Sequence, residues 1–185
     1  MIVDAAMSLI DKQGLSATSA REIANAAGVS LGTLTYHFAS VDDILVQVLT
    51  ALMDRDERRR AIVLAEYTDP LESLCAALTS YLDPEVYPPA TWRVWLDCWA
   101  RAAHSPMLRE WQLARYAESY EEVEEIIAEG IAQGCFLPMD ARQCARELVA
   151  LLDGLAEQML IDSELSSEQA RAIIDGAVRR RMASG

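Results

Sequence analysis

Residues 21–38, REIANAAGVSLGTLTYHF, carry two short apolar-periodic stretches on either side of a single glycine. Ser19 precedes Glu22 by three residues, which is the form of a capping box at the start of a helix. Gly28 is placed to end that helix after little more than two turns. Ser30 is a suitable N-cap for a following helix. The stretch therefore predicts two short helices joined by a glycine-centred turn.

The spacing of small and apolar residues in this stretch fits a helix-turn-helix. Ala24 allows the two helices to cross closely, Gly28 allows a positive φ in the turn, and Leu34 anchors the second helix in a core. Ile23 and Val29 supply the remaining apolar contacts. Part of this spacing also occurs in other two-helix corners, so the exposed residues have to carry the functional argument.

The exposed side of the second helix is polar, and it points to DNA. Hydroxyl groups suit phosphates and base edges, and a threonine methyl suits the thymine methyl. The start of the first helix offers free N–H groups and a favourable dipole to a phosphate. The candidate DNA contacts are Thr18, Ser19, Arg21, Ser30, Gly32, Thr33, Thr35, Tyr36 and His37. The alternative is a solvated polar face on a small helical bundle.

Helical periodicity continues along the whole chain, without convincing strand alternation. We expect an all-α fold of about nine helices, with a three-helix DNA-binding head in residues 1–40 and a larger ligand-binding and dimerisation body in residues 41–185. Proline-rich residues 83–91 form the clearest break. The expected body helices cover about 41–67, 70–81, 92–103, 106–133, 140–162 and 167–182.

Composition bounds the function. The 185-residue chain is 52% hydrophobic and 24% charged, with a formal net charge of -13. Such acidity argues against non-specific binding to nucleic acid. No apolar run reaches the roughly 20 residues of a membrane span, and the N-terminus does not read as a signal peptide. Four widely spaced cysteines in apolar surroundings predict reduced, buried thiols and a cytoplasmic location.

Residues 17–45, ATSAREIANAAGVSLGTLTYHFASVDDIL, closely resemble the N-terminal signature of TetR-family transcriptional regulators. Residues 92–110 and 129–160 resemble, more loosely, the body of the BetI-like branch. The resemblance implies an all-α homodimer with a DNA-binding head and a body that binds a small-molecule inducer.

Two positions depart from the family pattern, which usually has an aromatic residue at Thr35 and commonly a lysine at Val41. Residues 1–40 also contain only two basic residues, Lys12 and Arg21, against three acidic ones. Each lost phosphate contact lowers DNA affinity and its salt dependence. We therefore expect operator binding that relies on hydroxyl, backbone and dipole contacts.

An aromatic group is expected in the body. Three tryptophans follow a three-then-four spacing, which places them on one helix face. They form either core packing or the wall of an inducer pocket, in which indole faces would suit a cation. The candidate ligand-binding residues are Trp92, Trp95, Trp99, Tyr116 and Tyr120. The identity of the inducer stays open.

The last two helices predict an interface between two copies of the chain. Residues 140–162 are apolar almost all round, which implies burial on two sides. Paired C-terminal helices would form a four-helix interface across a two-fold axis. The candidate interface residues are Leu148, Leu152, Leu155, Met159, Ile173, Ile174 and Val178. The alternative is an intramolecular core in a monomer.

No nucleophile elbow, phosphate-binding glycine loop or metal-ligand spacing is present, so we expect no enzyme activity, no metal and no cofactor. The sequence predicts a dimeric regulator, in most cases of this kind a repressor, that an inducer releases from a double-stranded DNA operator. The alternative is an acidic helical small-molecule-binding protein whose TetR-like head no longer binds an operator. A membrane partner is not expected.

Overall fold

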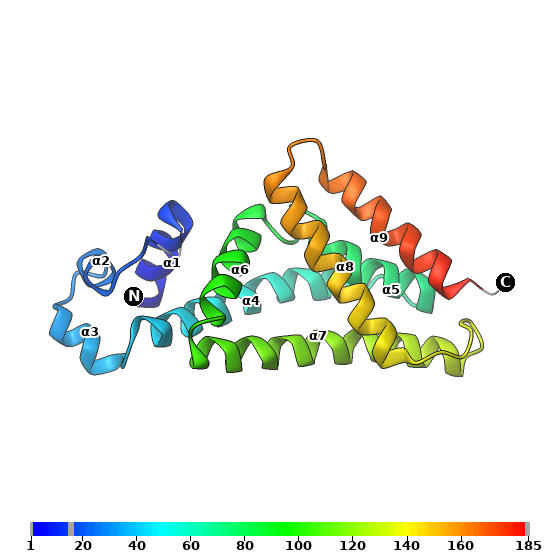
Figure 1. Ribbon diagram of the computed structural model, residues 1–185, viewed down its shortest axis with the longest axis horizontal. Helices are drawn as coiled ribbons and strands as arrows, with labels where there is room; N and C mark the ends of the chain where they lie inside the picture. Colours follow the sequence, from blue (N-terminus) through cyan, green and yellow to red (C-terminus); the bar gives the residue numbers. More distant parts are fainter. Residues whose placement is uncertain (1, 15–16, 184–185) are drawn as a thin grey trace. The chain divides into compact units, whose positions relative to one another are not determined.

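A computed structural model describes residues 2–14 and 17–183, except for the side chain of Asp11. These residues form nine α-helices, one short 3-10 helix and no strand (Figure 1), which confirms the expected all-α fold. The helices are α1 (Ile2–Gln13), α2 (Ala20–Ala26), α3 (Leu31–His37), α4 (Val41–Leu64), α5 (Pro70–Thr79), η1 (Ser80–Leu82), α6 (Pro89–Ala102), α7 (Pro106–Ala132), α8 (Ala141–Ile161) and α9 (Ser167–Met182).

Helix boundaries agree with the sequence signals, with three differences. The sixth helix, expected from about residue 92, begins at Pro89, inside the proline-rich stretch 83–91, because proline is tolerated in the first turn of a helix. The fourth helix ends at Leu64, because residues 65–67 turn out of the helix through shorter i→i+3 bonds such as Tyr67 N–H to the Leu64 carbonyl. The fifth helix ends at Thr79 and continues as a 3-10 turn, η1, so the expected single helix to Tyr81 consists of two kinds of turn.

The chain forms two compact units. The first contains residues 1–55 and 90–114, and the second contains residues 56–89 and 115–185. Helices α4 and α7 contribute to both. The first unit thus includes more than the expected head, since it adds α6 and the beginning of α7 to the first 55 residues.

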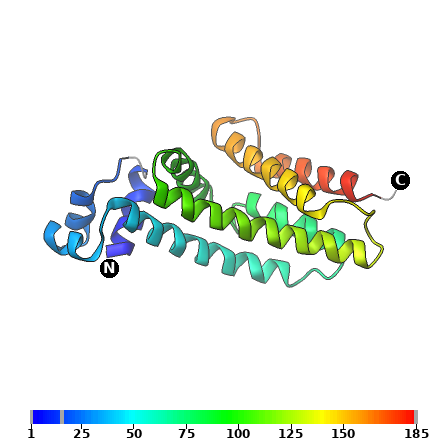
Figure 2. The same ribbon diagram turned by 60° about the horizontal axis from the view of Figure 1, so that its bottom comes forward.

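A single apolar core holds the first unit together. Ile23 and Ala24 of α2 and Leu34 of α3 are at most 2% exposed, and they pack with α1, α4 and α6. In this unit α7 lies beside α4 (Figure 2), and the indole Nε1 of Trp111 donates to the hydroxyl of Thr50 over 3.2 Å. The short helices α2 and α3 are therefore fixed by tertiary packing, as helices of seven residues require.

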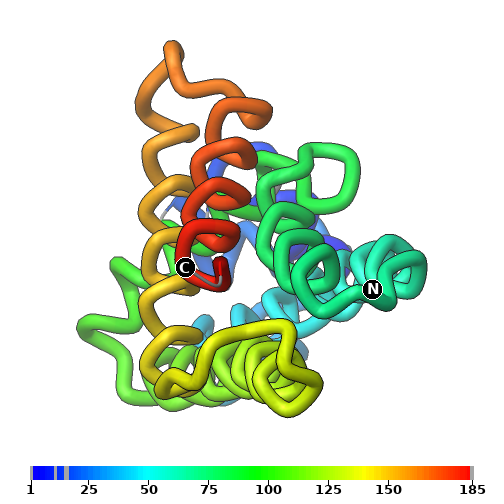
Figure 3. The backbone as a smooth tube through the Cα atoms, turned by 90° about the vertical axis from the view of Figure 1, so that its right-hand side faces the viewer, coloured from blue at the N-terminus to red at the C-terminus, as the bar shows by residue number. Residues whose placement is uncertain are grey.

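Helix α9 in the second unit packs against α5 on one side and α8 on the other (Figure 3). Its buried stripe is Ala170, Ile174, Val178 and Met182, each no more than 2% exposed. Ion pairs reinforce the packing: Arg179 donates to both carboxylate oxygens of Glu72 on α5, at 2.9 and 3.0 Å. The apolar face of α9 is thus used inside its own chain.

Arg60 is a buried charge of the second unit with several hydrogen bonds. It is 2% exposed, and its guanidinium donates to the Ala77 carbonyl, to Ser80 Oγ and to Glu122 Oε1, the last over 2.7 Å. It also lies 4.2 Å from the ring centroid of Tyr81. One side chain of α4 therefore ties together α5, η1 and α7 within this unit.

Candidate functional site

The beginning of α2 is a complete capping box, as the sequence predicts. The Ser19 hydroxyl accepts from the Glu22 N–H, and the Glu22 carboxylate accepts from the Ser19 N–H at 2.9 Å. The Ser19 hydroxyl also donates to the Glu22 carboxylate at 2.6 Å, and this bond, with that from the Ser19 N–H, holds the pKa of Glu22 below its ordinary value. Glu22 neutralises part of the positive end of α2. Arg21 is exposed and is the only cation of this helix, so it is the residue of α2 that can pair with a phosphate.

Thr18 requires a correction. Its side chain is only 6% exposed, and its hydroxyl donates to the Gly14 carbonyl over 2.8 Å. The threonine therefore connects the end of α1 to the start of α2 inside the unit. A side-chain contact between Thr18 and DNA is not compatible with this burial, and we remove it from the candidate contacts.

The turn between α2 and α3 depends on a left-handed residue. Gly28 has a φ of 68°, and its N–H donates to the Asn25 carbonyl. The next N–H, that of Val29, donates to the Ala24 carbonyl over 3.0 Å. A residue with a Cβ is strained at this φ. Glycine thus sets the angle at which α3 leaves α2.

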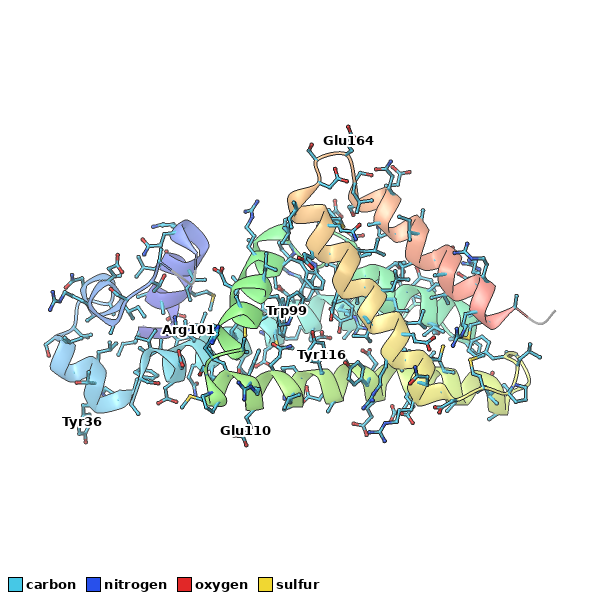
Figure 4. All side chains as sticks on the ribbon, in the orientation of Figure 1. Tyr36, Trp99, Arg101, Glu110, Tyr116 and Glu164 are labelled. Atoms are coloured by element: carbon cyan, nitrogen blue, oxygen red, sulfur yellow. The ribbon has the colours of Figure 1, made fainter. Side chains whose placement is uncertain are left out.

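Helix α3 is held to the core through one side chain and exposes the others. Leu34 is 1% exposed, whereas Tyr36 is 85% exposed and points away from the neighbouring helices of its unit (Figure 4). The Tyr36 and His37 rings meet edge to face, with centroids 5.1 Å apart. The outer face of α3 is thus an aromatic and hydroxyl surface without arginine or lysine.

The hydroxyl groups of α3 are partly engaged by the helix itself. Ser30 caps the helix by accepting from the Thr33 N–H at 3.0 Å, and its Oγ lies 2.8 Å from the Thr33 hydroxyl. The Thr35 hydroxyl donates to the Leu31 and Gly32 carbonyls. These bonds fix the side-chain rotamers and leave acceptor lone pairs and methyl groups for a partner.

Gly32 lies on the exposed side of α3. A Cβ at this position would meet only the Ser30 hydroxyl, at an ordinary 3.6 Å. Among the residues that the structure describes, no contact therefore requires glycine here, and its role in close approach to DNA stays a prediction.

All four tryptophans of the chain cluster in the first unit. Trp95 stacks on Trp111 with centroids 5.6 Å apart, and it also lies 6.3 Å from Trp99, which in turn lies 6.4 Å from Trp92. Trp92 and Trp95 are at most 8% exposed, so they are core residues. Trp99 is different, because its buried Nε1 has no hydrogen-bond acceptor among the described residues.

Tyr116 and Tyr120, both on α7, form a separate group in the second unit. Their rings stack with centroids 5.7 Å apart, and Arg146 lies over the Tyr120 ring. The Tyr116 hydroxyl donates to Asp153 of α8 over 3.0 Å. Burial raises the pKa of Asp153 to about 6 although this hydrogen bond lowers it. In the described part of the chain no ion pair to Asp153 is found.

The candidate interface residues require a second correction. Leu148, Leu152 and Leu155 are 4–5% exposed, and Ile174 and Val178 are fully buried. All five belong to the core of their own chain, so they are not available to a second copy. Of the candidates only Met159, which is half-buried, and Ile173, which is 44% exposed, remain at the surface.

A short capped helix, a glycine turn and a recognition helix with an exposed polar and aromatic face define a helix-turn-helix DNA-binding regulator. The tetR-family model of bacterial regulatory proteins matches residues 2–48, and the model of the BetI-type transcriptional repressor C-terminal region matches residues 70–183. The chain therefore belongs to the TetR family of transcriptional regulators, with a BetI-type body.

Individual relatives support this assignment. The chain is 31% identical to the HTH-type transcriptional regulator BetI 2 of Chromohalobacter salexigens, with 83% of this chain and 73% of that protein covered. It is 28% identical to BetI of Paraburkholderia xenovorans, covering 83% and 77%. A transcriptional regulator from Saccharomonospora viridis, solved in complex with choline, is 27% identical and superimposes with a TM-score of 0.86 over 100% of this chain and 96% of that one.

These relatives are transcriptional regulators and not enzymes. Over residues 2–14 and 17–183 we find no cluster of histidine, cysteine and acidic side chains suited to a metal ion. Within the same residues no helix is both long and apolar enough to cross a membrane.

One candidate residue was missed by the sequence reasoning. Asp153 stands in the apolar run LVALLDGLAEQML of α8. A carboxylate inside such a run is the signal that was available, because a buried acid is costly without a partner.

Proposed function

We propose that this protein is a repressor that binds an operator as a dimer and is released by a small organic cation. The exposed face of α3, with Thr33, Thr35, Tyr36 and His37, carries the DNA-binding part of this proposal. Gly32 allows the helix to approach the base edges, and Ser19 and Arg21 at the start of α2 contact phosphate. Such a repressor acts on chromosomal DNA in the cytoplasm.

Operator binding is tested by titrating a duplex from the region upstream of the protein's own gene, across a series of salt concentrations. With so few cations in the head, we expect the logarithm of affinity to fall with the logarithm of salt by a slope of only about -2 to -4. A slope that corresponds to six or more phosphates per head contradicts this prediction. Absence of binding to any duplex selected from a random library favours the alternative, a binding protein whose head has lost its operator.

Asp153 is the residue that favours a cationic ligand. Asp153 is half-buried and bonded to a tyrosine hydroxyl, and a carboxylate that loses part of its hydration without a basic partner is disfavoured when ionised. A ligand cation would supply the missing charge beside Asp153, next to the stacked rings of Tyr116 and Tyr120. The choline bound to the Saccharomonospora viridis relative is a cation of this class. The orphan Nε1 of Trp99 in the first unit separately offers a donor to a ligand oxygen.

Choline binding is expected to depend on pH. Because the free carboxyl of Asp153 has a pKa of about 6 and the cation binds the ionised form, affinity should rise as pH increases through 6. Between pH 5 and 7.5 the ionised fraction increases about tenfold, and so does the affinity. Calorimetry at pH 5 and at pH 7.5 measures the affinity for choline. Asp153→Asn should bind at least tenfold more weakly at pH 7.5 and lose the pH dependence, whereas an unchanged profile would assign the cation elsewhere.

We place the dimer interface on the outer surface of α8 and α9, where Met159 and Ile173 are accessible together with Ile161, which is 73% exposed. Exposed apolar side chains mark an interface where they form a contiguous patch, whereas a single exposed isoleucine such as Ile62 does not. A dimer also suits a helix-turn-helix, since two heads meet half-sites one helical turn apart.

Ile173→Glu should dissociate the dimer, because two charges would be buried across a two-fold axis. Sedimentation at micromolar concentration should then give the 20.5 kDa monomer in place of a species of twice that mass. Ile62→Glu is the matched control, since Ile62 on α4 is 71% exposed and lies outside the proposed surface. If Ile173→Glu still sediments as a dimer, α9 is not the interface.

A further inference from the structure

Thr35 lies on the exposed face of the recognition helix α3, but its hydroxyl hydrogen is used inside that helix. The hydroxyl donates to the Leu31 carbonyl over 3.1 Å and to the Gly32 carbonyl over 3.2 Å. A threonine hydroxyl has one hydrogen to donate, and helices commonly bind it at a carbonyl of the preceding turn. In this arrangement Thr35 offers a base no donor, although its oxygen keeps acceptor lone pairs.

The same two bonds direct the methyl group of Thr35 outward. The hydroxyl and the methyl group occupy different staggered positions on Cβ. An oxygen that faces the Leu31 and Gly32 carbonyls therefore turns the methyl group away from them. Because Thr35 is exposed, this methyl group is an apolar contact surface available to a partner.

The backbone next to Thr35 permits a close approach to a partner. With about 3.6 residues per turn, Gly32 and Tyr36 lie nearly opposite the buried Leu34, and Thr35 lies beside them. Gly32 has no side chain that would hold a partner at a distance, and it is exposed. A short side chain such as threonine can therefore reach a base edge from this part of α3.

The chemistry of this surface suits an A·T pair better than a G·C pair. Guanine presents two acceptors in the major groove, N7 and O6, and these need a donor. Residues 31–37 contain no arginine, lysine, asparagine or glutamine, and the Thr35 hydroxyl hydrogen is already bonded. Thymine instead presents its C5-methyl group, and the paired adenine presents a donor, the N6 amino group. A methyl group with acceptor lone pairs beside it matches this pattern.

We propose that Thr35 selects an A·T pair in the operator by packing its methyl group against the C5-methyl group of thymine. The inference rests on the proposed DNA binding and names the base pair that one position of α3 requires. Thr33 is not given this role, because its Oγ lies 2.8 Å from Ser30 Oγ in a bond in which either oxygen can be the donor. The Thr33 hydroxyl can therefore still donate to a base, whereas that of Thr35 is engaged.

The experiment starts from a duplex selected from a random library and replaces its thymines by deoxyuridine, one at a time. Deoxyuridine lacks the C5-methyl group but keeps the base pair and every phosphate. Anisotropy of the labelled duplex measures the affinity of the full-length protein. We expect the wild type to bind about fourfold more weakly at one thymine in each half-site, which is the contribution of one buried methyl group. The salt dependence should stay the same, because no charge is removed.

Thr35→Ser removes the methyl group from the protein and keeps a hydroxyl that can bond to the same carbonyls. It should bind the thymine duplex about fourfold more weakly for each half-site and lose nothing further when that thymine becomes deoxyuridine. Thr35→Val keeps a methyl group without the hydroxyl, so it should remain sensitive to deoxyuridine even if serine alters the helix.

Thr50→Ser is the matched control on α4. The Thr50 hydroxyl also donates to the carbonyl four residues earlier, that of Val46, over 2.8 Å, and Thr50 is exposed. This variant should bind both kinds of duplex as the wild type does, because Thr50 has no expected contact with DNA.

Three outcomes overturn the inference: a wild type that is insensitive to deoxyuridine at every thymine, a Thr35→Ser variant that is as sensitive as the wild type at each of them, or an insensitive Thr35→Val variant. Failure of the wild type to bind any selected duplex is instead a failure of the proposed function. Anisotropy with the unsubstituted duplexes reveals that failure before any deoxyuridine is introduced.

Discussion

Arg60→Met is expected to lower the free energy of unfolding by about 3 kcal/mol. The substitution keeps most of the aliphatic volume but removes a guanidinium that is 2% exposed and bonded to Ala77, Ser80 and Glu122. The Ala77 carbonyl loses two donors, and Glu122 loses its ion pair with the guanidinium. Urea denaturation followed by far-ultraviolet circular dichroism measures the change, because helix content reports on both units.

The size of this effect follows from the exposure of the partners. Side chains of Glu57 and Glu122 are 38% and 33% exposed, so water can solvate them after the arginine is removed. The Ala77 carbonyl keeps the hydrogen bond from the Ser80 hydroxyl at 3.2 Å, so losing the guanidinium donors costs less than a fully unsatisfied buried acceptor, which costs about 1–3 kcal/mol. The loss therefore lies near the lower end of the range for a broken buried ion pair, which is about 3–5 kcal/mol.

Arg58→Met is the control, because Arg58 belongs to the same basic run and is exposed. Its replacement should change the free energy of unfolding by less than about 0.5 kcal/mol. Equal losses in the two variants would show that the basic run stabilises α4 through its overall charge, and that the Arg60 contacts are not responsible.

The comparison of these arginines also shows where sequence reasoning ends. The run Arg58, Arg59, Arg60 looks uniform in the sequence. Arg60 is buried because α5 and η1 pack against α4 in the second unit, and the sequence alone does not show this packing. The charge pattern of a helix predicts its solvated face, whereas a buried charge depends on acceptors that are far away in the chain, here 17 and 20 residues.

Local signals, in contrast, predicted the helices well. Ser19 with Glu22 and Ser30 cap helices as expected, and Gly28 has the positive φ that its turn position requires. These features depend on bonds within four residues, so a sequence contains them completely. The same reasoning holds for the exposed face of α3, because helical periodicity separates Leu34 from Tyr36.

The sequence does not predict which neighbouring helix or chain covers an apolar helix face. Ile174 and Val178 of α9 were assigned to a second copy of the chain, yet α5 and α8 cover them. An apolar stripe shows that a helix face is buried but not by which neighbour. Thr18 was assigned to DNA for a similar reason, since its hydroxyl has a partner, the Gly14 carbonyl, that spacing alone does not reveal.

Tyr36→Ala is expected to weaken operator binding by about 100-fold without changing stability. Tyr36 is 85% exposed, so the fold loses almost no buried area when the ring is removed. A side chain that contacts base edges contributes about 1–3 kcal/mol, and a dimer uses each contact twice. Anisotropy at fixed salt measures affinity, and thermal unfolding by circular dichroism measures stability.

Tyr36→Phe separates the two parts of the side chain. The Phe ring keeps the edge-to-face contact with His37, whose centroid lies 5.1 Å away, and loses only the hydroxyl. If the hydroxyl donates to phosphate or a base edge, Phe should weaken binding about tenfold in the dimer. If the ring acts by apolar contact, Phe should bind as the wild type does.

Tyr67→Ala is the control for removal of an exposed tyrosine, because Tyr67 is 41% exposed and lies after α4 in the second unit. It should leave operator affinity within about twofold, since no DNA contact is expected there. Wild-type affinity in Tyr36→Ala would show that Tyr36 does not contact the operator. A salt slope that stays the same in Tyr36→Ala while affinity falls would assign the tyrosine to the bases, since loss of a charged phosphate contact reduces the slope.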